Sequence, residues 1–284
     1  MHPVLATLQV GDATITVGAY ATFVVLAAVV AVALGIGGAR AAGLSPAAAA
    51  AGLTIAVVAG IVAARLLDVA LHLPWYAADP VRSATPAPRG FVLYGGFLGG
   101  IGAVLLLSRA WRIPLAVLAD RWIPAVVAGI VLLRVGCFLN GCCAGIVTDL
   151  PWGVVFPVRP SAADAQALGG LGFLAVAEQP AAVHPTEIYE IVAALACGAI
   201  AWFVARRGAA AGIPALAFAG TFLAFRAANQ LVRAPSADPS IPPEWVPAIY
   251  AVAAACAGLL LVRTLRARRP SAAPTPARAL SASS

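Results

Sequence analysis

Three arginines lie inside long apolar stretches of this chain. Arg65, Arg134 and Arg226 each precede the end of their stretch by five or six residues. A charge inside a bilayer costs about 2.5–3.5 kcal/mol on insertion scales, so each of these residues is a candidate functional group. Glu190 and Tyr94 lie four or five residues inside two further stretches. At about 1.5 Å per residue, all five side chains are expected to share one layer, roughly 5–9 Å below one membrane surface.

The charges in this layer indicate an anion-binding site, although local pairing accounts for part of them. Arg65 and Asp68 are three residues apart on one helix face and can neutralise each other. Glu190 can neutralise Arg134 or Arg226. Even with both acids ionised, three arginines face two carboxylates. Because the planar fork of arginine binds phosphate bidentately, the surplus charge favours a lipid phosphate as the ligand.

The string RVGCFLNGCCAG, from Arg134 to Gly145, ends one of the stretches. Its glycines allow the backbone to approach a ligand or a neighbouring helix closely. Asn140 followed by Gly141 is typical of a helix end. The string is interpreted either as a ligand-binding loop or as a tight helix end with an ordinary loop after it.

Three of the five cysteines fall in this string, at Cys137, Cys142 and Cys143. Their spacing fits no usual zinc pattern, and we predict neither a metal site nor a cofactor. A disulfide from Cys137 to one of the adjacent pair is left open, because the compartment outside the membrane is oxidising. Cys197 and Cys256 are expected to be small buried residues within helices.

The string HPTEIYE, from His184 to Glu190, predicts a helix start. Pro185 precedes the helix, and Thr186 is expected to cap it. His184 is a candidate general base, a candidate phosphate ligand or a polar anchor at the membrane surface.

The string FVLYGGFLGG, from Phe91 to Gly100, contains Tyr94 and four glycines, among them Gly95 and Gly96. Small residues at this spacing let two helices pack closely, and they also leave room for a ligand. Both interpretations stay open.

These strings belong to a chain of 284 residues that is 62% hydrophobic and 10% charged, with a mean hydropathy of +0.95. Soluble domains contain about 25% charged residues, so the composition indicates an integral membrane protein and excludes secreted disulfide-rich modules and cytosolic enzymes. The net charge of +7 does not indicate nucleic acid as a partner, because the positions of the arginines relative to the apolar stretches are those of a membrane protein and not those of a basic patch on one face of a fold. A spanning helix needs about 20 apolar residues. We therefore predict an all-α fold with seven transmembrane helices, at about residues 15–37, 47–71, 91–110, 122–140, 186–205, 211–231 and 246–264.

The arginines also predict the orientation, because cytoplasmic segments of membrane proteins carry more positive charge. With a periplasmic N-terminus and a cytoplasmic C-terminus, eleven arginines are inside and four are outside. The inner ones are Arg40, Arg109, Arg112, Arg121, Arg206, Arg207, Arg263, Arg266, Arg268, Arg269 and Arg278, and the outer ones are Arg82, Arg89, Arg159 and Arg233.

The longest loop, at about 141–185, lies between the fourth and fifth predicted helices. It is too short for a separate catalytic domain and too apolar for a linker, so we interpret it as a small periplasmic cap. Residues 1–268 are then one transmembrane domain. The Pro/Ala/Ser-rich segment 269–284 is expected to be a disordered cytoplasmic tail.

Taken in order, these strings resemble the prolipoprotein diacylglyceryl transferase family. The resemblance rests on HPVL at the start, GIVAARLLDVAL, YGGFLGG, RVGCFLNGCCAG, HPTEIYE and FRAANQLVR, and it covers nearly the whole chain. It implies a bacterial inner-membrane transferase of lipoprotein biosynthesis. The expected donor is phosphatidylglycerol, the acceptor is the thiol of the lipobox cysteine in a prolipoprotein signal peptide, and glycerol phosphate is released.

The resemblance also assigns site residues. Arg134 and Arg226 are the expected phosphate-binding catalytic residues, with Tyr94 or His184 helping to deprotonate the thiol. The expected substrate-binding residues are Asn140, Gly141, Gly145, Tyr189, Glu190, Gly95, Gly96 and Arg65.

Several positions depart from the family pattern. Tyr94 stands where the family usually has a histidine. In the string after the fourth helix, Cys137 stands where the family has an asparagine and Cys142 where it has an acid. Phe222 and Gln230 replace a tyrosine and a glutamate, and Gly18-Ala19, beside Tyr20, replaces a Tyr-Gly pair. Of the family's site residues, those that bind phosphate are therefore kept, and those expected to transfer the proton are altered. Two alternatives follow: a divergent paralogue with another acceptor, and a non-catalytic protein that binds or transports anionic lipids.

Overall fold

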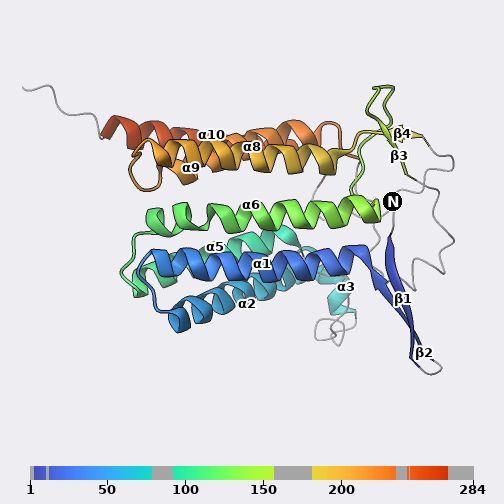
Figure 1. Ribbon diagram of the computed structural model, residues 1–284, viewed down its shortest axis with the longest axis horizontal. Coiled ribbons are helices and arrows are strands. Elements are labelled where there is room, and N and C mark those ends of the chain that lie inside the picture. Colours follow the sequence, from blue (N-terminus) through green and yellow to red (C-terminus); the bar gives the residue numbers. More distant parts are fainter. Residues whose placement is uncertain are drawn as a thin grey trace, which may run out of the picture.

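The structure is a computed structural model that describes residues 3–10, 13–78, 92–156, 181–234, 242 and 244–267. Its long helices lie side by side with their axes nearly parallel (Figure 1). They are α1 (Ala19–Ala41), α2 (Pro46–Leu71), α5 (Leu93–Ala110), α6 (Leu115–Asn140), α8 (Thr186–Arg206), α9 (Ile213–Gln230) and α10 (Trp245–Ala267). The predicted tail at 269–284 and part of the predicted cap, residues 157–180, lie outside the described residues.

Five of these helices, α1, α2, α6, α8 and α10, are long and apolar enough to cross a membrane. The other two, α5 and α9, are shorter, with 18 residues each. Exposed leucine, isoleucine and valine side chains cover much of the helix surface. In water such a surface is unfavourable, whereas in lipid it is the expected one. The chain is therefore a helical, multi-pass membrane protein.

A β-hairpin that was not predicted precedes α1. Strands β1 (Val4–Val10) and β2 (Ala13–Gly18) pair antiparallel, with Thr7 opposite Thr16. The first predicted transmembrane stretch began at residue 15, which is wrong by four residues, because the helix starts at Ala19. The reason is local: residues 14–17 read Thr-Ile-Thr-Val, and β-branched residues favour a strand.

The helices form two groups that α6 joins. In the first group α1 packs chiefly on α6, where the Trp122 indole N–H donates to the Gly35 carbonyl at 3.0 Å, and α5 packs on α2. In the second group α9 lies between α8 and α10, and α6 packs on α8. Residues that converge at one end of α6, α8 and α9 can thus meet at the junction of the two groups.

Two glycines of α5, Gly95 and Gly99, allow close packing against α2. A Cβ on Gly95 would lie 2.5 Å from the carbonyl oxygen of Ala63, and one on Gly99 would lie 2.4 Å from the Ala63 Cβ. No side chain fits at these distances without moving the backbone. The packing interpretation of the glycine-rich string is confirmed for these two residues.

The loop after α6 fastens three helix ends together. The Gly145 N–H donates to the His184 carbonyl at 2.8 Å, and the Ile146 N–H donates to the Val232 carbonyl at 2.9 Å. Short strands β3 (Val154–Val155) and β4 (Ala182–Val183) pair beside this contact. The loop therefore fixes the segment before α8 and the segment after α9 in one position relative to α6. It lies at the same end of the bundle as the β1–β2 hairpin and the short helix α3 (Leu73–Ala77) (Figure 1).

Candidate functional site

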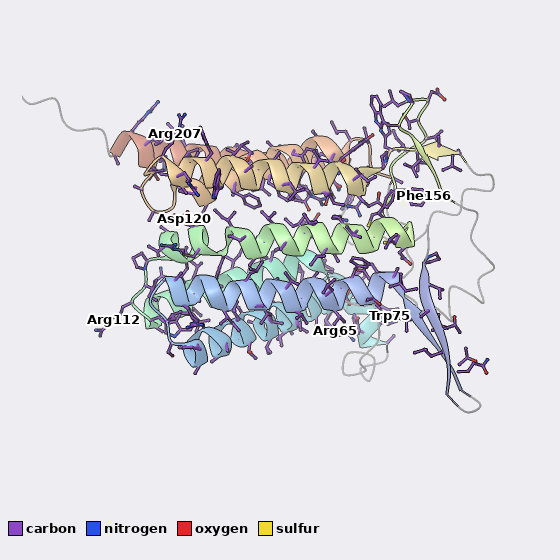
Figure 2. All side chains as sticks on the ribbon, viewed as in Figure 1. Arg65, Trp75, Arg112, Asp120, Phe156 and Arg207 are labelled. Carbon is purple, nitrogen blue, oxygen red and sulfur yellow. The ribbon has the colours of Figure 1, made fainter. Side chains whose placement is uncertain are left out.

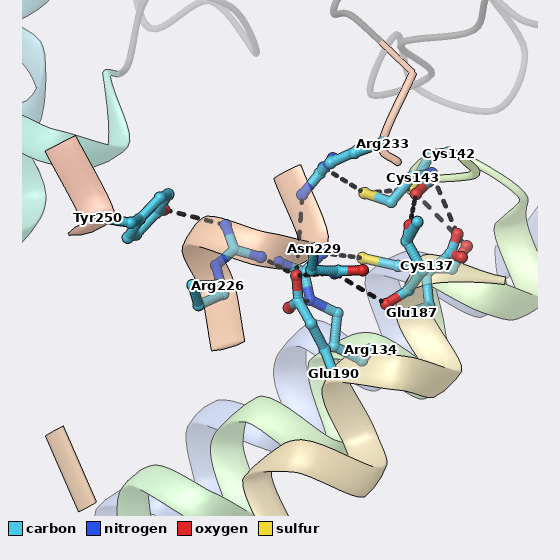
Figure 3. A network of polar contacts seen from close by, with 11 residues as sticks. Arg134, Cys137, Cys142, Cys143, Glu187, Glu190, Arg226, Asn229, Arg233 and Tyr250 are labelled. Carbon is cyan, nitrogen blue, oxygen red and sulfur yellow. Dashed lines mark hydrogen bonds and ion pairs between the residues drawn. The ribbon is translucent and has the colours of Figure 1, made fainter. Parts of the chain in front are cut away.

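A single carboxylate, that of Glu190, is the centre of the candidate site. It projects from the first turns of α8 and is only 2% exposed. It forms ion pairs with Arg134 of α6 and Arg226 of α9. Arg233, three residues after α9 ends, places its Nη1 atom 4.0 Å from the same carboxylate (Figure 3). Because three arginines pair with this one carboxylate, the ion-paired group carries a surplus of positive charge.

Asn229 and Thr186 hold this centre in place. The Asn229 amide N–H₂ donates to the Glu190 Oε1 atom and to the Thr186 carbonyl, both at 3.3 Å. The Thr186 hydroxyl donates to the Cys143 carbonyl at 2.5 Å. The prediction that Thr186 caps α8 is wrong: it is the first helical residue, Pro185 occupies the cap position, and the hydroxyl is used to bind the loop.

Tyr94 is connected to the arginines through a second tyrosine. Arg226 donates to the Tyr250 hydroxyl at 2.9 Å, and its guanidinium lies 4.8 Å from the centroid of that ring. Tyr94 in turn shares a side-chain hydrogen bond with Tyr250. Four of the five residues predicted to share a layer, namely Arg134, Arg226, Glu190 and Tyr94, thus form one connected set, and the depth of that layer in a membrane stays a prediction.

The loop that follows α6 brings the three cysteines together. The helix ends at Asn140 as predicted, and Gly141 adopts φ 69°, the left-handed conformation that reverses the chain. The sulfur atoms of Cys137, Cys142 and Cys143 all lie within 4.8 Å of one another, and all three are free thiols. Of the other two cysteines, Cys197 is buried as predicted, whereas the prediction of a buried Cys256 is wrong, because that residue is exposed on α10.

Two of these sulfurs contact the arginines of the centre. Arg134 lies 3.9 Å from the Cys137 Sγ atom, and Arg233 donates to the Cys143 Sγ atom at 3.1 Å (Figure 3). Hydrogen bonds from the Cys137 and Cys142 thiols, together with the positive charges of Arg233 and Arg134, hold the pKa of Cys143 well below its ordinary value. The last turn of α6 and the loop after it therefore place two cysteine sulfurs against the arginines of the centre.

The His184 side chain belongs to a different group of contacts. Its Nδ1 atom lies 3.2 Å from the Tyr189 hydroxyl, which also accepts the Trp152 indole N–H at 2.8 Å. The described side-chain hydrogen bonds of His184 and Tyr189 are thus with each other and with Trp152, in the loop that follows α6.

Arg65 belongs to a second polar group, on α2 and α3. It lies 3.8 Å from Asp68 and donates to the Tyr76 hydroxyl at 3.0 Å, while that hydroxyl donates to Asp68 at 2.5 Å. The local pairing of Arg65 with Asp68 is confirmed. Burial, followed by the hydrogen bond to Asp68, raises the pKa of Tyr76, so its hydroxyl stays a donor.

Sequence reasoning missed three residues of the centre. Tyr250 lies a few residues inside the last apolar stretch, so the depth argument applied to Arg134 could have found it. Asn229 is three residues after Arg226 and shares its helix face. Arg233 was counted only as an outer charge; the backbone bridge between Arg233 and Gly145 that places it is a tertiary contact with no local signal.

Comparison with known proteins gives a consistent result. A sequence model described as prolipoprotein diacylglyceryl transferase matches residues 6–265. The chain is also similar to proteins named phosphatidylglycerol–prolipoprotein diacylglyceryl transferase. The one from Fusobacterium nucleatum is 27% identical, with 54% of this chain and 61% of the relative covered. The one from Geobacter sulfurreducens is 32% identical, with 59% and 57% covered. The one from Solidesulfovibrio magneticus is 30% identical, with 70% and 69% covered.

Each of these matches spans between 57% and 69% of the relative's length. The family match, by contrast, extends over nearly all of this chain, and it includes every residue of the Glu190 centre. The chain belongs to the prolipoprotein diacylglyceryl transferase family.

Proposed function

We propose that this protein transfers the diacylglyceryl group of phosphatidylglycerol to the thiol of the lipobox cysteine in prolipoproteins and releases glycerol phosphate. The observation that carries the proposal is the convergence of Arg134, Arg226 and Arg233 on the buried carboxylate of Glu190. Positive charge is in surplus among these ion-paired residues, near one end of the helices. An anionic phosphodiester is the group that such a centre attracts from a bilayer.

In the proposed reaction the sulfur of the acceptor cysteine attacks the glyceryl carbon that bears the phosphate. A carbon–sulfur bond forms, the carbon–oxygen bond breaks, and its electron pair leaves on the phosphate oxygen. Arg134 and Arg226 stabilise that growing negative charge, which is larger in the transition state than in the bound lipid. Glu190 holds both guanidinium groups in place before the lipid arrives.

The acceptor must lose its proton, since the thiolate is the nucleophile. Tyr94 and Tyr250 are the proposed participants, because their hydrogen-bonded pair ends on Arg226. His184 is proposed as a polar anchor in the cap, in keeping with its contact with Tyr189.

The remaining predicted substrate-binding residues keep a proposed role near the headgroup or the lipid. Asn140, Gly141 and Gly145 belong to the loop beside the centre, whereas Gly95 and Gly96 lie on α5 close to α2. Arg65 is proposed to face lipid headgroups together with its partner Asp68.

A largely apolar hollow supports a lipid as the donor. It has a volume of about 1060 Å³ and lies between α6 and α8, where Val127, Val131, Leu132, Leu195 and Trp202 are among the apolar residues that line it and Asp120 and Arg121 are the charged ones. An acyl chain is the complement of such a surface. The hollow is proposed to hold part of the diacylglyceryl group.

The proposed setting is the bacterial inner membrane, with seven spanning helices, a periplasmic N-terminus and cap, and a cytoplasmic C-terminus. The distribution of arginines supports this orientation. Arg112 and Arg207 lie at the end of the bundle opposite to Arg65 (Figure 2). The centre would then be open to the outer leaflet, where the secreted acceptor is.

The test is a transfer assay with purified protein, phosphatidylglycerol and a lipobox peptide. We expect a gain of the diacylglyceryl mass on the peptide and release of glycerol phosphate. Arg134→Ala should abolish both, whereas Arg109→Ala, which removes an exposed arginine of α5, should leave both unchanged. A peptide with serine in place of the lipobox cysteine should not react. Binding of phosphatidylglycerol without transfer would refute the proposal and support the non-catalytic alternative.

A further inference from the structure

We propose that Cys137, Cys142 and Cys143 form a binding site for one Cu(I) ion. The three sulfur atoms come from the last turn of α6 and the first residues of the loop, and they lie within 4.8 Å of one another. Thiolate sulfur is the soft donor that selects Cu(I) over harder ions. This inference does not depend on the proposed transfer reaction.

The distances between the sulfurs suit a metal with three sulfur ligands. For metal–sulfur bonds of about 2.3 Å, sulfurs at the corners of a trigonal plane are about 4.0 Å apart. The Cys142 and Cys143 sulfurs are 3.8 Å apart already. The third sulfur needs to move by less than about 1 Å to complete the triangle, because none of the separations exceeds 4.8 Å.

The number of donors favours Cu(I) over zinc. Structural zinc sites are almost always tetrahedral, with four protein ligands. Within the described part of the chain, no fourth cysteine, histidine or carboxylate joins the three sulfurs. A three-coordinate ion is therefore the better match.

The positive charges beside the three sulfurs also suit a bound Cu(I) ion, because they compensate the negative charge of the complex. Cu(I) bound by three thiolates carries a net charge of −2, once the three thiols have released their protons to solvent. Arg134 contacts the Cys137 sulfur and Arg233 contacts the Cys143 sulfur, so two positive charges stand beside the complex. Donors that hydrogen-bond to metal ligands strengthen the site and orient those ligands.

The loop is already held in the required shape. The Cys143 N–H donates to the Glu187 Oε1 atom at 3.2 Å, and the Cys143 carbonyl accepts the Thr186 hydroxyl. Gly141, in the left-handed conformation, turns the chain so that Cys142 and Cys143 fold back toward Cys137. The spacing C-x4-C-C, which argued against zinc at the level of sequence, is therefore no obstacle to a three-sulfur site.

The test is an anaerobic titration of the reduced, purified protein with Cu(I), in competition with the colorimetric chelator bathocuproine disulfonate. We expect one Cu(I) per chain. Cys142→Ser and Cys143→Ser should each weaken binding by at least about tenfold. The matched control is the Cys197→Ser/Cys256→Ser double variant, which removes the two cysteines outside the cluster and should bind as the wild type does.

X-ray absorption on the wild-type complex gives a second readout that needs no variant to fold. Three sulfur neighbours at about 2.3 Å are expected. The proposal would be overturned by undiminished Cu(I) binding in both cluster variants, or by tighter binding of Zn(II) than of Cu(I). A disulfide within the cluster of the protein as isolated, seen by mass spectrometry as the loss of two hydrogens, would also overturn it and make the cluster a redox pair.

Discussion

Replacing Glu190 with glutamine should make the protein less stable and, at the same time, better at binding an anionic lipid. In the wild type the carboxylate is 2% exposed and compensates three arginines. The amide of Glu190→Gln keeps the shape and one acceptor oxygen but removes the charge. Buried Arg226 and the partly buried Arg134 and Arg233 then lose the one carboxylate with which all three form ion pairs.

The size of both effects follows from the geometry. Breaking a buried ion pair by removing one partner costs about 3–5 kcal/mol, and because glutamine retains an acceptor we expect about 3 kcal/mol. For Arg233 alone, at 4.0 Å from the carboxylate, the Coulomb attraction is about 4 kcal/mol at an effective dielectric constant of 20. A bound phosphate restores a negative charge among the three arginines and no longer meets the repulsion of Glu190. Its affinity should therefore rise by at least about tenfold, which is about 1.4 kcal/mol.

The assay is thermal unfolding in a neutral detergent, with phosphatidylglycerol or zwitterionic phosphatidylcholine added in increasing amounts. Without lipid, Glu190→Gln should melt several degrees below the wild type. Phosphatidylglycerol at about 100 times its Kd stabilises by about 2.7 kcal/mol, so it should restore most of the loss. The matched control is Gly52→Ala on α2, whose added Cβ would collide with the Trp111 ring, far from the Glu190 centre along the chain and outside the hollow between α6 and α8. That variant should be destabilised with no added response to phosphatidylglycerol. Equal rescue of Glu190→Gln by both lipids would refute an anion site at the arginines.

Three further variants test other parts of the site. Gly145→Ala should cost about 1–3 kcal/mol of unfolding free energy, because its Cβ would lie 2.4 Å from the Val232 carbonyl oxygen. The control Gly102→Ala, at a position with open space around it, should be neutral or slightly stabilising. Similar melting temperatures for the two variants would contradict the close packing at Gly145. Tyr250→Phe removes a hydrogen bond to the charged Arg226, and such a bond contributes about 1.5–3 kcal/mol. The variant should slow transfer by about 10- to 100-fold while phosphatidylglycerol still binds. An unchanged kcat would exclude the tyrosine pair from the reaction. Arg226→Lys should lower kcat by at least about tenfold, because an ammonium group cannot donate to Tyr250, Glu190 and a phosphate in one plane. A rate close to that of the wild type would show that a positive charge at this position is sufficient.

Helix depth was the strongest signal in the sequence. Arg134, Glu190 and Arg226 lie on three different helices, and their common layer follows from counting residues to the end of each apolar stretch. That count correctly indicated residues that meet, because in parallel helices that cross one bilayer, residues equally far from the same membrane surface lie at the same level. The stop at Gly141 was likewise predictable, since glycine after asparagine is a local helix-ending signal.

The parts that sequence reasoning missed depend on contacts between distant segments. Arg233 reaches Glu190 only because the loop at Gly145 pairs with the chain after α9. The cysteine cluster depends on the same loop, whose spacing along the chain says little about distances in space. The hairpin before α1 was missed for a different reason: an apolar run of β-branched residues reads equally well as the start of a spanning helix.

The two candidate ligands of this end of the molecule share two arginines but not the same N–H groups. Arg134 directs its Nε atom to Glu190 and an Nη atom to the Cys137 sulfur. Arg233 divides its two Nη atoms in the same way, one toward Glu190 and one toward Cys143. A guanidinium has five donors in a rigid plane, so one edge can serve an oxyanion while another serves a thiolate. Turning either guanidinium to follow a ligand on one side changes its hydrogen bonds on the other. Occupation of the sulfurs and binding of a phosphate must therefore influence each other through Arg134 and Arg233, and by thermodynamic linkage the influence is the same in both directions.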